Sequence, residues 1–137
     1  MIKKKKVKSL PKLRKECLDL LAEREKLKAE LDNRLFCYTC DVPLKNHTTN
    51  CQLGHYLARG AYPGLAFHPD NSRLQCFPCN IGKHGNIIEF RERLIKEIGL
   101  QRVTMLEQER HLKTKLGRSD YLEMIERFKV EIKELNA

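Results

Sequence analysis

Tryptophan is absent from this 137-residue sequence, and no run of 18 apolar residues occurs in it. We therefore expect no membrane-spanning helix. The lysine-rich start is followed by Ser9, Leu10 and Pro11 rather than by the apolar segment of a secretory signal. These absences predict a cytoplasmic protein with reduced cysteines. Hydrophobic residues make up 41% of the chain, and its middle third is polar. Such a chain buries a modest core, which favours a structural metal.

Acidic residues are missing from residues 1–15, which carry eight lysines or arginines. The other 122 residues are nearly balanced, with a net charge of +1, so the total of +9 comes mainly from the tail. A tail of this kind binds phosphate backbone through counterion release, without reading sequence. A solvated end without a partner is the alternative. The tail lysines that we expect to contact DNA are Lys3, Lys4, Lys5 and Lys6.

Two Cys-x-x-Cys pairs, Cys37/Cys40 and Cys76/Cys79, are separated by 35 residues. Four thiolates in two such turns make a closed tetrahedral zinc site, which is typical of structural and not of catalytic zinc. A competing set combines the first pair with His47 and Cys51, but it leaves the second pair without a role. The sequence therefore favours one structural zinc held by the two pairs.

Local patterns divide the chain into a basic tail (1–9), an amphipathic helix (10–34), a zinc-stapled core (35–99) and C-terminal helices (100–137). The stripe of the first helix can pack on the chain's own core or, as a coiled coil, on a second copy in a homodimer. Cys17 lies in this stripe and fits a buried small residue. Its apolar or small positions are 10, 13, 17, 20, 27 and 31.

Short strands are expected over residues 51–57 and 73–75. A helix is expected from Asn86 to the C-cap Gly99. The two helical patterns that follow are separated by Gly117. The first contains Val103, Leu106 and Leu116, and the second opens with a capping box of Asp120 and Glu123.

A histidine and two asparagines surround the cysteine pairs in the order His55, Asn71, Asn80, the order found in HNH nucleases. His55 is the candidate general base, because an imidazole takes up a proton near neutral pH when a partner holds its other nitrogen. Asn71 is expected to brace the loop that positions His55, and the Asn80 carbonyl to ligate Mg²⁺ or Mn²⁺. Each asparagine can instead serve locally, in an Asx-turn or as a helix cap. Arg59, Arg73 and Lys83 flank this constellation and are the expected DNA contacts.

Several segments in order resemble the NinG (Rap) recombination endonucleases of lambdoid phages, over roughly residues 37–100. The resemblance implies a ββα-metal (HNH-like) core and a divalent-metal-dependent nuclease that prefers branched DNA, such as Holliday junctions and D-loops, in the cytoplasm of the phage host. The segments that carry it are Gly54 to Ala61, Leu65 to His68, Asn71 to Cys76, Cys79-Asn80, Gly85-Asn86, Phe90-Arg91, Leu94-Ile95 and Ile98-Gly99.

Two departures from the family pattern bear on the site. Family members usually carry a longer N-terminal region with its own cysteines before the core, whereas only a lysine tail and a helix precede the core here. A substrate preference that is set by that region does not carry over to this chain. Many HNH sites also place a metal-ligating Asp directly before the histidine, where this chain has Gly54. The catalytic cation therefore needs a second protein ligand besides Asn80, and the candidates are Gln75, His84 and Asn86.

We therefore expect an α+β protein, with a small ββα-metal core stapled by structural zinc and flanked by N- and C-terminal helices. The expected activity is Mg²⁺- or Mn²⁺-dependent cleavage of branched DNA. The alternatives are a zinc-stapled DNA-binding protein without catalysis, and an HNH nickase or homing-type nuclease with sequence preference.

Overall fold

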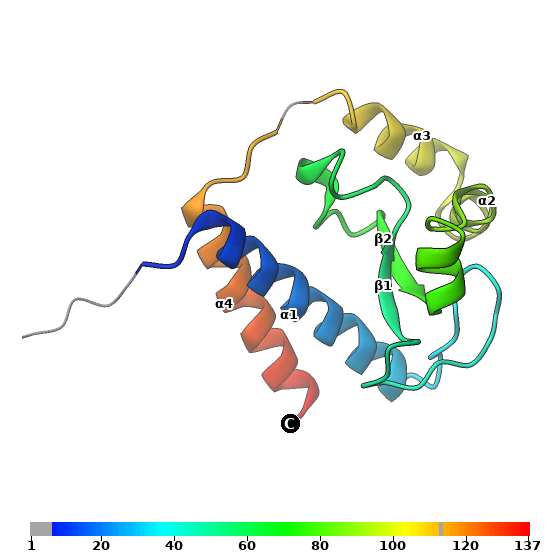
Figure 1. Ribbon diagram of the computed structural model, residues 1–137, viewed down its shortest axis with the longest axis horizontal. Helices are drawn as coiled ribbons and strands as arrows, with labels where there is room; N and C mark the ends of the chain where they lie inside the picture. Colours follow the sequence, from blue (N-terminus) through cyan, green and yellow to red (C-terminus); the bar gives the residue numbers. More distant parts are fainter. Residues whose placement is uncertain (1–6, 113) are drawn as a thin grey trace, which may run out of the picture.

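The computed structural model describes residues 7–112 and 114–137, which form four α-helices and a two-stranded antiparallel sheet, with the first helix lying between the last helix and the sheet (Figure 1). The architecture is thus mixed α+β. Lys3 to Lys6 lie outside the described residues. The elements in chain order are α1 (Leu10–Leu31), β1 (Gln52–His55), the 3₁₀ turn η1 (Pro63–Leu65), β2 (Ser72–Gln75), the π-helical turn η2 (Pro78–Gly82), α2 (Ile87–Ile98), α3 (Leu100–Glu109) and α4 (Arg118–Leu135).

Helix α1 begins where the sequence predicts and packs against α4 of the same chain. Ser9 accepts a hydrogen bond from the Lys12 amide and caps the helix, so it belongs to α1 and not to the tail. The predicted stripe is right at its centre and wrong at its ends, because Leu10 and Leu31 are exposed. The buried residues of the helix are Leu13, Cys17, Leu21 and Ala29.

The two long helices run parallel, side by side (Figure 1). Near their starts, Arg14 Nε donates to the Tyr121 hydroxyl over 3.0 Å and the Cys17 thiol donates to the Tyr121 carbonyl over 3.3 Å. Further along, Arg24 pairs with Glu131. Of the two partners expected for the α1 stripe, the structure shows the one within the chain.

Helices α3 and α4 differ from the prediction at their ends. Helix α3 stops at Glu109, so Leu116 lies in the connection to α4 rather than in a helix. Helix α4 begins at Arg118 with Gly117 as its N-cap, three residues before the predicted cap Asp120. Asp120 caps the helix from inside its first turn, where its Oδ2 accepts a hydrogen bond from the Gly117 amide over 2.8 Å. Carboxylates are favourable there because the helix dipole is positive at its N-terminus.

The sheet is shorter at β1 than the predicted strand, and its register pairs Gln52 with Gln75 and His55 with Ser72. One sheet face carries Leu53 and Leu74, which pack near Ala29 of α1. The opposite face carries both glutamines, because alternate strand residues point to opposite sides. A second core, formed mainly by α2, α3 and the segment after β1, contains Tyr56, Leu57, Leu65, Phe90, Leu94, Val103 and Leu106.

No helix in the described ranges has the length and apolar character needed to cross a membrane.

Candidate metal centre and candidate catalytic residues

The four cysteines of the two Cys-x-x-Cys pairs converge on one point. Cys37 and Cys40 lie in the turn after α1, whereas Cys76 directly follows β2 and Cys79 lies in η2. All four Sγ atoms are within 4.8 Å of one another, and those of Cys40 and Cys76 are 3.6 Å apart. Tetrahedral zinc with bonds of about 2.3 Å requires sulfur–sulfur edges of roughly 3.8 Å. The cluster therefore has the size and ligand chemistry to hold a zinc ion.

Backbone hydrogen bonds hold the two cysteine turns together. The Tyr38 amide donates to the Leu74 carbonyl over 2.9 Å, which docks the first turn on β2. In the second turn, the Asn80 amide donates to the Cys76 carbonyl over 2.9 Å and the Gly85 amide to the Cys79 carbonyl over 3.0 Å. These bonds fix the backbone of the two turns in the folded protein and so determine where the four thiols lie.

The thiols differ in their electrostatic environments. Burial raises the pKa of Cys76 to about 12. Burial also raises the pKa of Cys37, but hydrogen bonds from the Cys76 backbone and from the Thr39 hydroxyl and backbone outweigh it and bring that pKa down to about 6. Deprotonating the whole set therefore requires a compensating positive charge, which a divalent cation at its centre supplies.

The competing ligand set is not assembled. His47 is exposed, whereas Cys51 is buried among apolar residues near Leu44. Within the described ranges, the two Cys-x-x-Cys pairs make the one group of three or more Cys, His, Asp or Glu side chains close enough to share an ion.

His55 lies at the end of β1, partly buried, with its Nε2 atom 2.9 Å from the Ala66 carbonyl oxygen. The pKa of His55 is lowered from its ordinary value, first by burial and further by the positive charge of Arg59. The bond to Ala66 acts in the opposite direction but is outweighed. The imidazole is thus neutral at pH 7.

Asn71 braces the segment that carries Ala66. The Asn71 side chain is fully buried, and its Oδ1 accepts the Leu57 amide over 2.8 Å. Its Nδ2 donates to the Leu57 carbonyl over 2.9 Å and to the Leu65 carbonyl over 3.0 Å. Asn71 therefore closes the loop between β1 and η1. Ala66, which directly follows Leu65, provides the carbonyl that contacts His55.

Asn80 lies in η2, on the sheet face opposite Leu53 and Leu74. Its Nδ2 donates to Gln52 Oε1 over 2.8 Å, which fixes the orientation of the carboxamide. The structure thus brings His55 and Asn71 into one loop and attaches Asn80 to the other end of β1.

The three candidates for a second cation ligand have different surroundings. Gln75 is fully buried and bonded within the protein. Asn86 directs its Nδ2 at the Cys79 sulfur, 3.8 Å away. His84 is exposed in the turn before α2.

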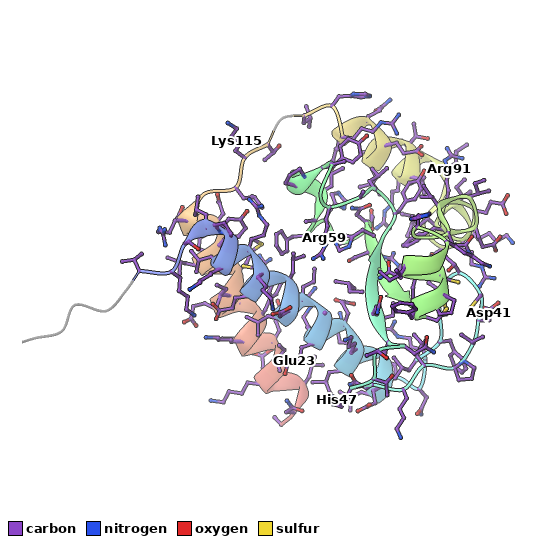
Figure 2. All side chains as sticks on the ribbon, viewed as in Figure 1. Glu23, Asp41, His47, Arg59, Arg91 and Lys115 are labelled. Atoms are coloured by element: carbon purple, nitrogen blue, oxygen red, sulfur yellow. The ribbon has the colours of Figure 1, made fainter. Side chains whose placement is uncertain are left out.

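The expected DNA contacts are not equivalent. Arg59, labelled in Figure 2, and Lys83 are exposed. Arg73 is engaged by the protein, with a paired contact to Glu97 at 3.1 and 3.2 Å and its guanidinium 5.5 Å from the Tyr38 ring centre. Sequence alone does not reveal this pairing, because the partners are on different elements.

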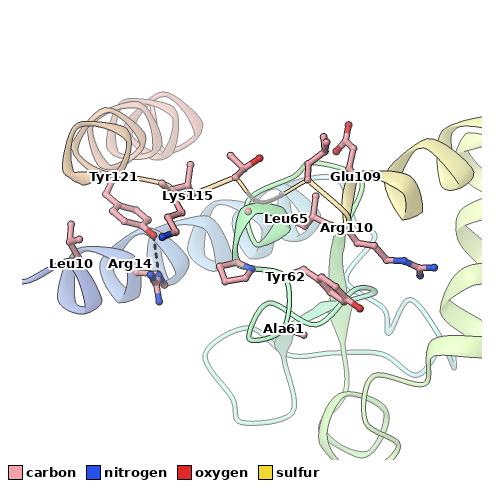
Figure 3. A pocket seen from close by; sticks show the side chains of 14 residues that line it. Leu10, Arg14, Ala61, Tyr62, Leu65, Glu109, Arg110, Lys115 and Tyr121 are labelled. Atoms are coloured by element: carbon pink, nitrogen blue, oxygen red, sulfur yellow. Dashed lines mark hydrogen bonds between the residues drawn. The ribbon is translucent and has the colours of Figure 1, made fainter.

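A separate cavity of about 560 Å³ lies between the starts of α1 and α4 and the loop around η1 (Figure 3). The hydrogen bond between Arg14 and Tyr121 crosses part of its wall. Neither His55 nor any cysteine lines it.

Comparison with known proteins identifies relatives in lambdoid and related phages. The family model described as Bacteriophage Lambda NinG protein matches residues 1–137. The "Protein ninG" of Salmonella phage P22 is 35% identical over 82 residues, which are 58% of this chain and 38% of the relative. That of Escherichia phage lambda is 36% identical over 80 residues, 57% of this chain and 37% of the relative. That of Enterobacteria phage H19B is 41% identical over 54 residues, 39% of this chain and 27% of the relative.

The matched region thus spans less than two fifths of the length of these relatives. No solved structure is significantly similar to the chain.

Proposed function

The chain belongs to the NinG family, and on this premise we propose that it is a divalent-metal-dependent endonuclease that cleaves branched DNA intermediates of phage recombination. The observation that carries the proposal is the contact between His55 Nε2 and the Ala66 carbonyl. Phosphodiester hydrolysis needs a group that takes a proton from the attacking water, and this contact prepares His55 for that role.

The contact determines the tautomer of the imidazole. A carbonyl oxygen only accepts hydrogen bonds, so the Nε2 atom of His55 carries the hydrogen. The lone pair is then on Nδ1, to which no side chain or amide of the described residues donates. His55 therefore presents an unprotonated nitrogen that is not used by the fold.

The protonation state supports the same role. Because burial and the charge of Arg59 lower the pKa of His55, the base is in its active, neutral form at physiological pH. The Ala66 carbonyl also stabilises the imidazolium that forms once the proton has been taken up.

Asn80 is the candidate ligand for the catalytic cation. With Nδ2 bound to Gln52, the Asn80 carboxamide leaves Oδ1 with no donor among the described residues. A hard amide oxygen of this kind suits Mg²⁺ or Mn²⁺. The cation, when bound, neutralises charge that develops on the phosphate and the leaving oxygen. The proposal assigns His55 as base, Asn71 as the brace of its loop and Asn80 as ligand. Asn80 is bonded to Gln52 at the start of β1, whereas His55 ends the strand, so the substrate phosphate would have to bridge the two ends of β1.

In this proposal zinc in the four-cysteine cluster is structural, because four thiolates leave no open coordination position. Exposed Arg59 and Lys83, with the lysine tail, supply phosphate contacts that position DNA without reading its sequence. Recognition of a branch would then depend on the shape and phosphate geometry of the substrate.

A cleavage assay tests the proposal. Purified protein is incubated with a four-way junction and with linear duplexes of the same arm sequences, in Mg²⁺, Mn²⁺ or EDTA. We expect metal-dependent cleavage that favours the junction. Equal cleavage of junction and duplex at fixed sequences would indicate a sequence-selective nuclease instead. Binding without cleavage in either metal would indicate a DNA-binding protein.

A further inference from the structure

Gln75 is the last residue of β2 and is completely buried. Its Nε2 donates two hydrogen bonds, one to Thr39 Oγ1 over 3.0 Å and one to the Gly85 carbonyl over 2.8 Å. Since the Gly85 carbonyl only accepts, the amide nitrogen must lie on this side and the oxygen on the other. The orientation of the Gln75 side chain is therefore determined by its partners.

Both partners of Gln75 belong to the cysteine turns. The Thr39 hydroxyl is 3.6 Å from Cys37 Sγ in the first turn. Gly85 closes the second turn, where its amide donates to the Cys79 carbonyl. One buried amide thus connects the two halves of the metal centre.

The oxygen end of Gln75 lies against β1. A Cβ placed on Gly54 would be 1.8 Å from Gln75 Oε1, so the carboxamide occupies the space that a side chain at position 54 would need. Gly54 directly precedes His55, and a Cβ on Gly85 would come within 3.5 Å of the His55 carbonyl oxygen. The amide and the turn that it holds therefore form the surface on which the His55 end of β1 rests.

The Gln75 oxygen has no donor among the described residues, although it is buried. An unsatisfied buried oxygen is costly, so an apolar side chain of the same size would suit this layer better if packing alone mattered. The two hydrogen bonds of the amide nitrogen are what an apolar residue cannot provide.

We propose that Gln75 is a positioning residue that couples the four-cysteine centre to the strand end that carries His55. Filling the centre with metal fixes Thr39 and Gly85, these fix the Gln75 amide, and the amide fixes Gly54 and His55. The catalytic meaning of this coupling rests on the proposed function, whereas the coupling itself is a property of the fold.

Amide NMR of the metal-loaded protein tests the coupling without any cleavage. Exchange of zinc for cadmium lengthens the metal–sulfur bonds and perturbs the centre. In the wild type, we expect the amide resonances of Gly54 and His55 to shift clearly more than those of α4. Two variants test the connection. Gln75→Met removes both hydrogen bonds of the Gln75 side-chain amide, and Thr39→Val removes only the one to Thr39. In each, we expect the Gly54 and His55 shifts to fall at least about twofold, while the shifts of the cysteines remain.

Thr49→Val is the matched control, because Thr49 is an exposed threonine outside this network. It should preserve the wild-type shifts. Undiminished Gly54 and His55 shifts in Thr39→Val would overturn the proposal, and this variant decides the question if Gln75→Met does not fold.

Cleavage supplies the second readout. With junction affinity and zinc content unchanged, turnover by Gln75→Met should fall roughly 10- to 100-fold, the usual effect of a misplaced catalytic group. If the wild type cuts no DNA, the proposed function fails while the NMR experiment still tests the coupling.

Discussion

The carbonyl oxygen of Ala66 lies 2.9 Å from Nε2 of His55, although 11 residues separate them in the chain. The contact leaves Nδ1 as the proton acceptor of the imidazole. Asn71 holds the loop in which Ala66 is placed. The proposed catalytic role of His55 therefore depends on a short buried network, and the predictions below address its parts.

His55→Ala should lower junction cleavage by about 10²- to 10⁴-fold, the usual contribution of a positioned general base. Zinc content and junction affinity should stay near wild type, because His55 is not part of the cysteine cluster. Single-turnover cleavage at saturating protein measures the effect. His111→Ala, which removes an exposed histidine at the end of α3, is the control. Wild-type cleavage by His55→Ala would contradict the mechanism and make His84 the next candidate base.

Cleavage should lose rate at acidic pH as His55 becomes protonated. The folded pKa of His55 is below the ordinary 6.5, so the acid limb of the profile should fall below that pH. Arg59→Gln removes a charge that lowers this pKa, and the acid limb should then move to higher pH. Turnover at saturating DNA separates this effect from lost DNA binding. An acid limb that moves to lower pH in Arg59→Gln would contradict the assignment.

The same pKa direction predicts how His55 affects folding. Because the unfolded chain binds the proton more tightly, the contribution of His55 to stability is present above about pH 6.5 and is lost as the pH falls through the folded pKa. The free energy of unfolding of His55→Ala should therefore depend less on pH below 6.5 than that of the wild type. Urea unfolding at a series of pH values measures this.

Removing the metal should unfold the middle of the chain. We expect one zinc per chain by elemental analysis, and loss of structure around the cluster when a strong chelator or Cys76→Ser removes it, because binding and folding are coupled. Circular dichroism and amide NMR follow the loss. Cys17→Ala is the matched control, since Cys17 is buried between α1 and α4 and away from the cluster. Folded protein that contains no metal would show that the cluster is dispensable.

Asn71→Leu should destabilise the fold by about 2–3 kcal/mol, because it leaves buried backbone groups of Leu57 and Leu65 without partners. Urea unfolding at constant pH with zinc present gives the difference. Asn136→Ala changes an exposed asparagine after α4 and should have little effect. A loss below 0.5 kcal/mol, the range of ordinary surface substitutions, would mean that Asn71 does not brace the loop.

Deleting residues 1–6 removes four lysines and leaves the Ser9 cap of α1 in place. DNA affinity should fall and its dependence on salt should become shallower, because fewer counterions are released. Fluorescence anisotropy at several salt concentrations measures both. The cut positions should not change, since phosphate contacts carry no sequence information. An unchanged salt dependence would mean that the tail does not touch DNA.

Local spacing was sufficient for a large part of this structure. The two Cys-x-x-Cys pairs predict the cysteine cluster because each turn brings two thiols together, and the closed set needs only that the two turns meet. Helix α2 and its Gly99 C-cap also follow from local sequence. These features depend on residues a few positions apart, whose geometry the chain determines by itself.

Contacts between distant residues were decided only by the tertiary structure. The α1 stripe is compatible with two partners, and the fold assigns it to α4. A sequence cannot show that Arg73 is paired with Glu97, or which carbonyl holds His55. Gln75 appears in the sequence only as a polar strand residue, and the fold gives it contacts with both cysteine turns and with Gly54. The physical reason is that one residue type can satisfy its polar groups in many ways, and packing selects among them.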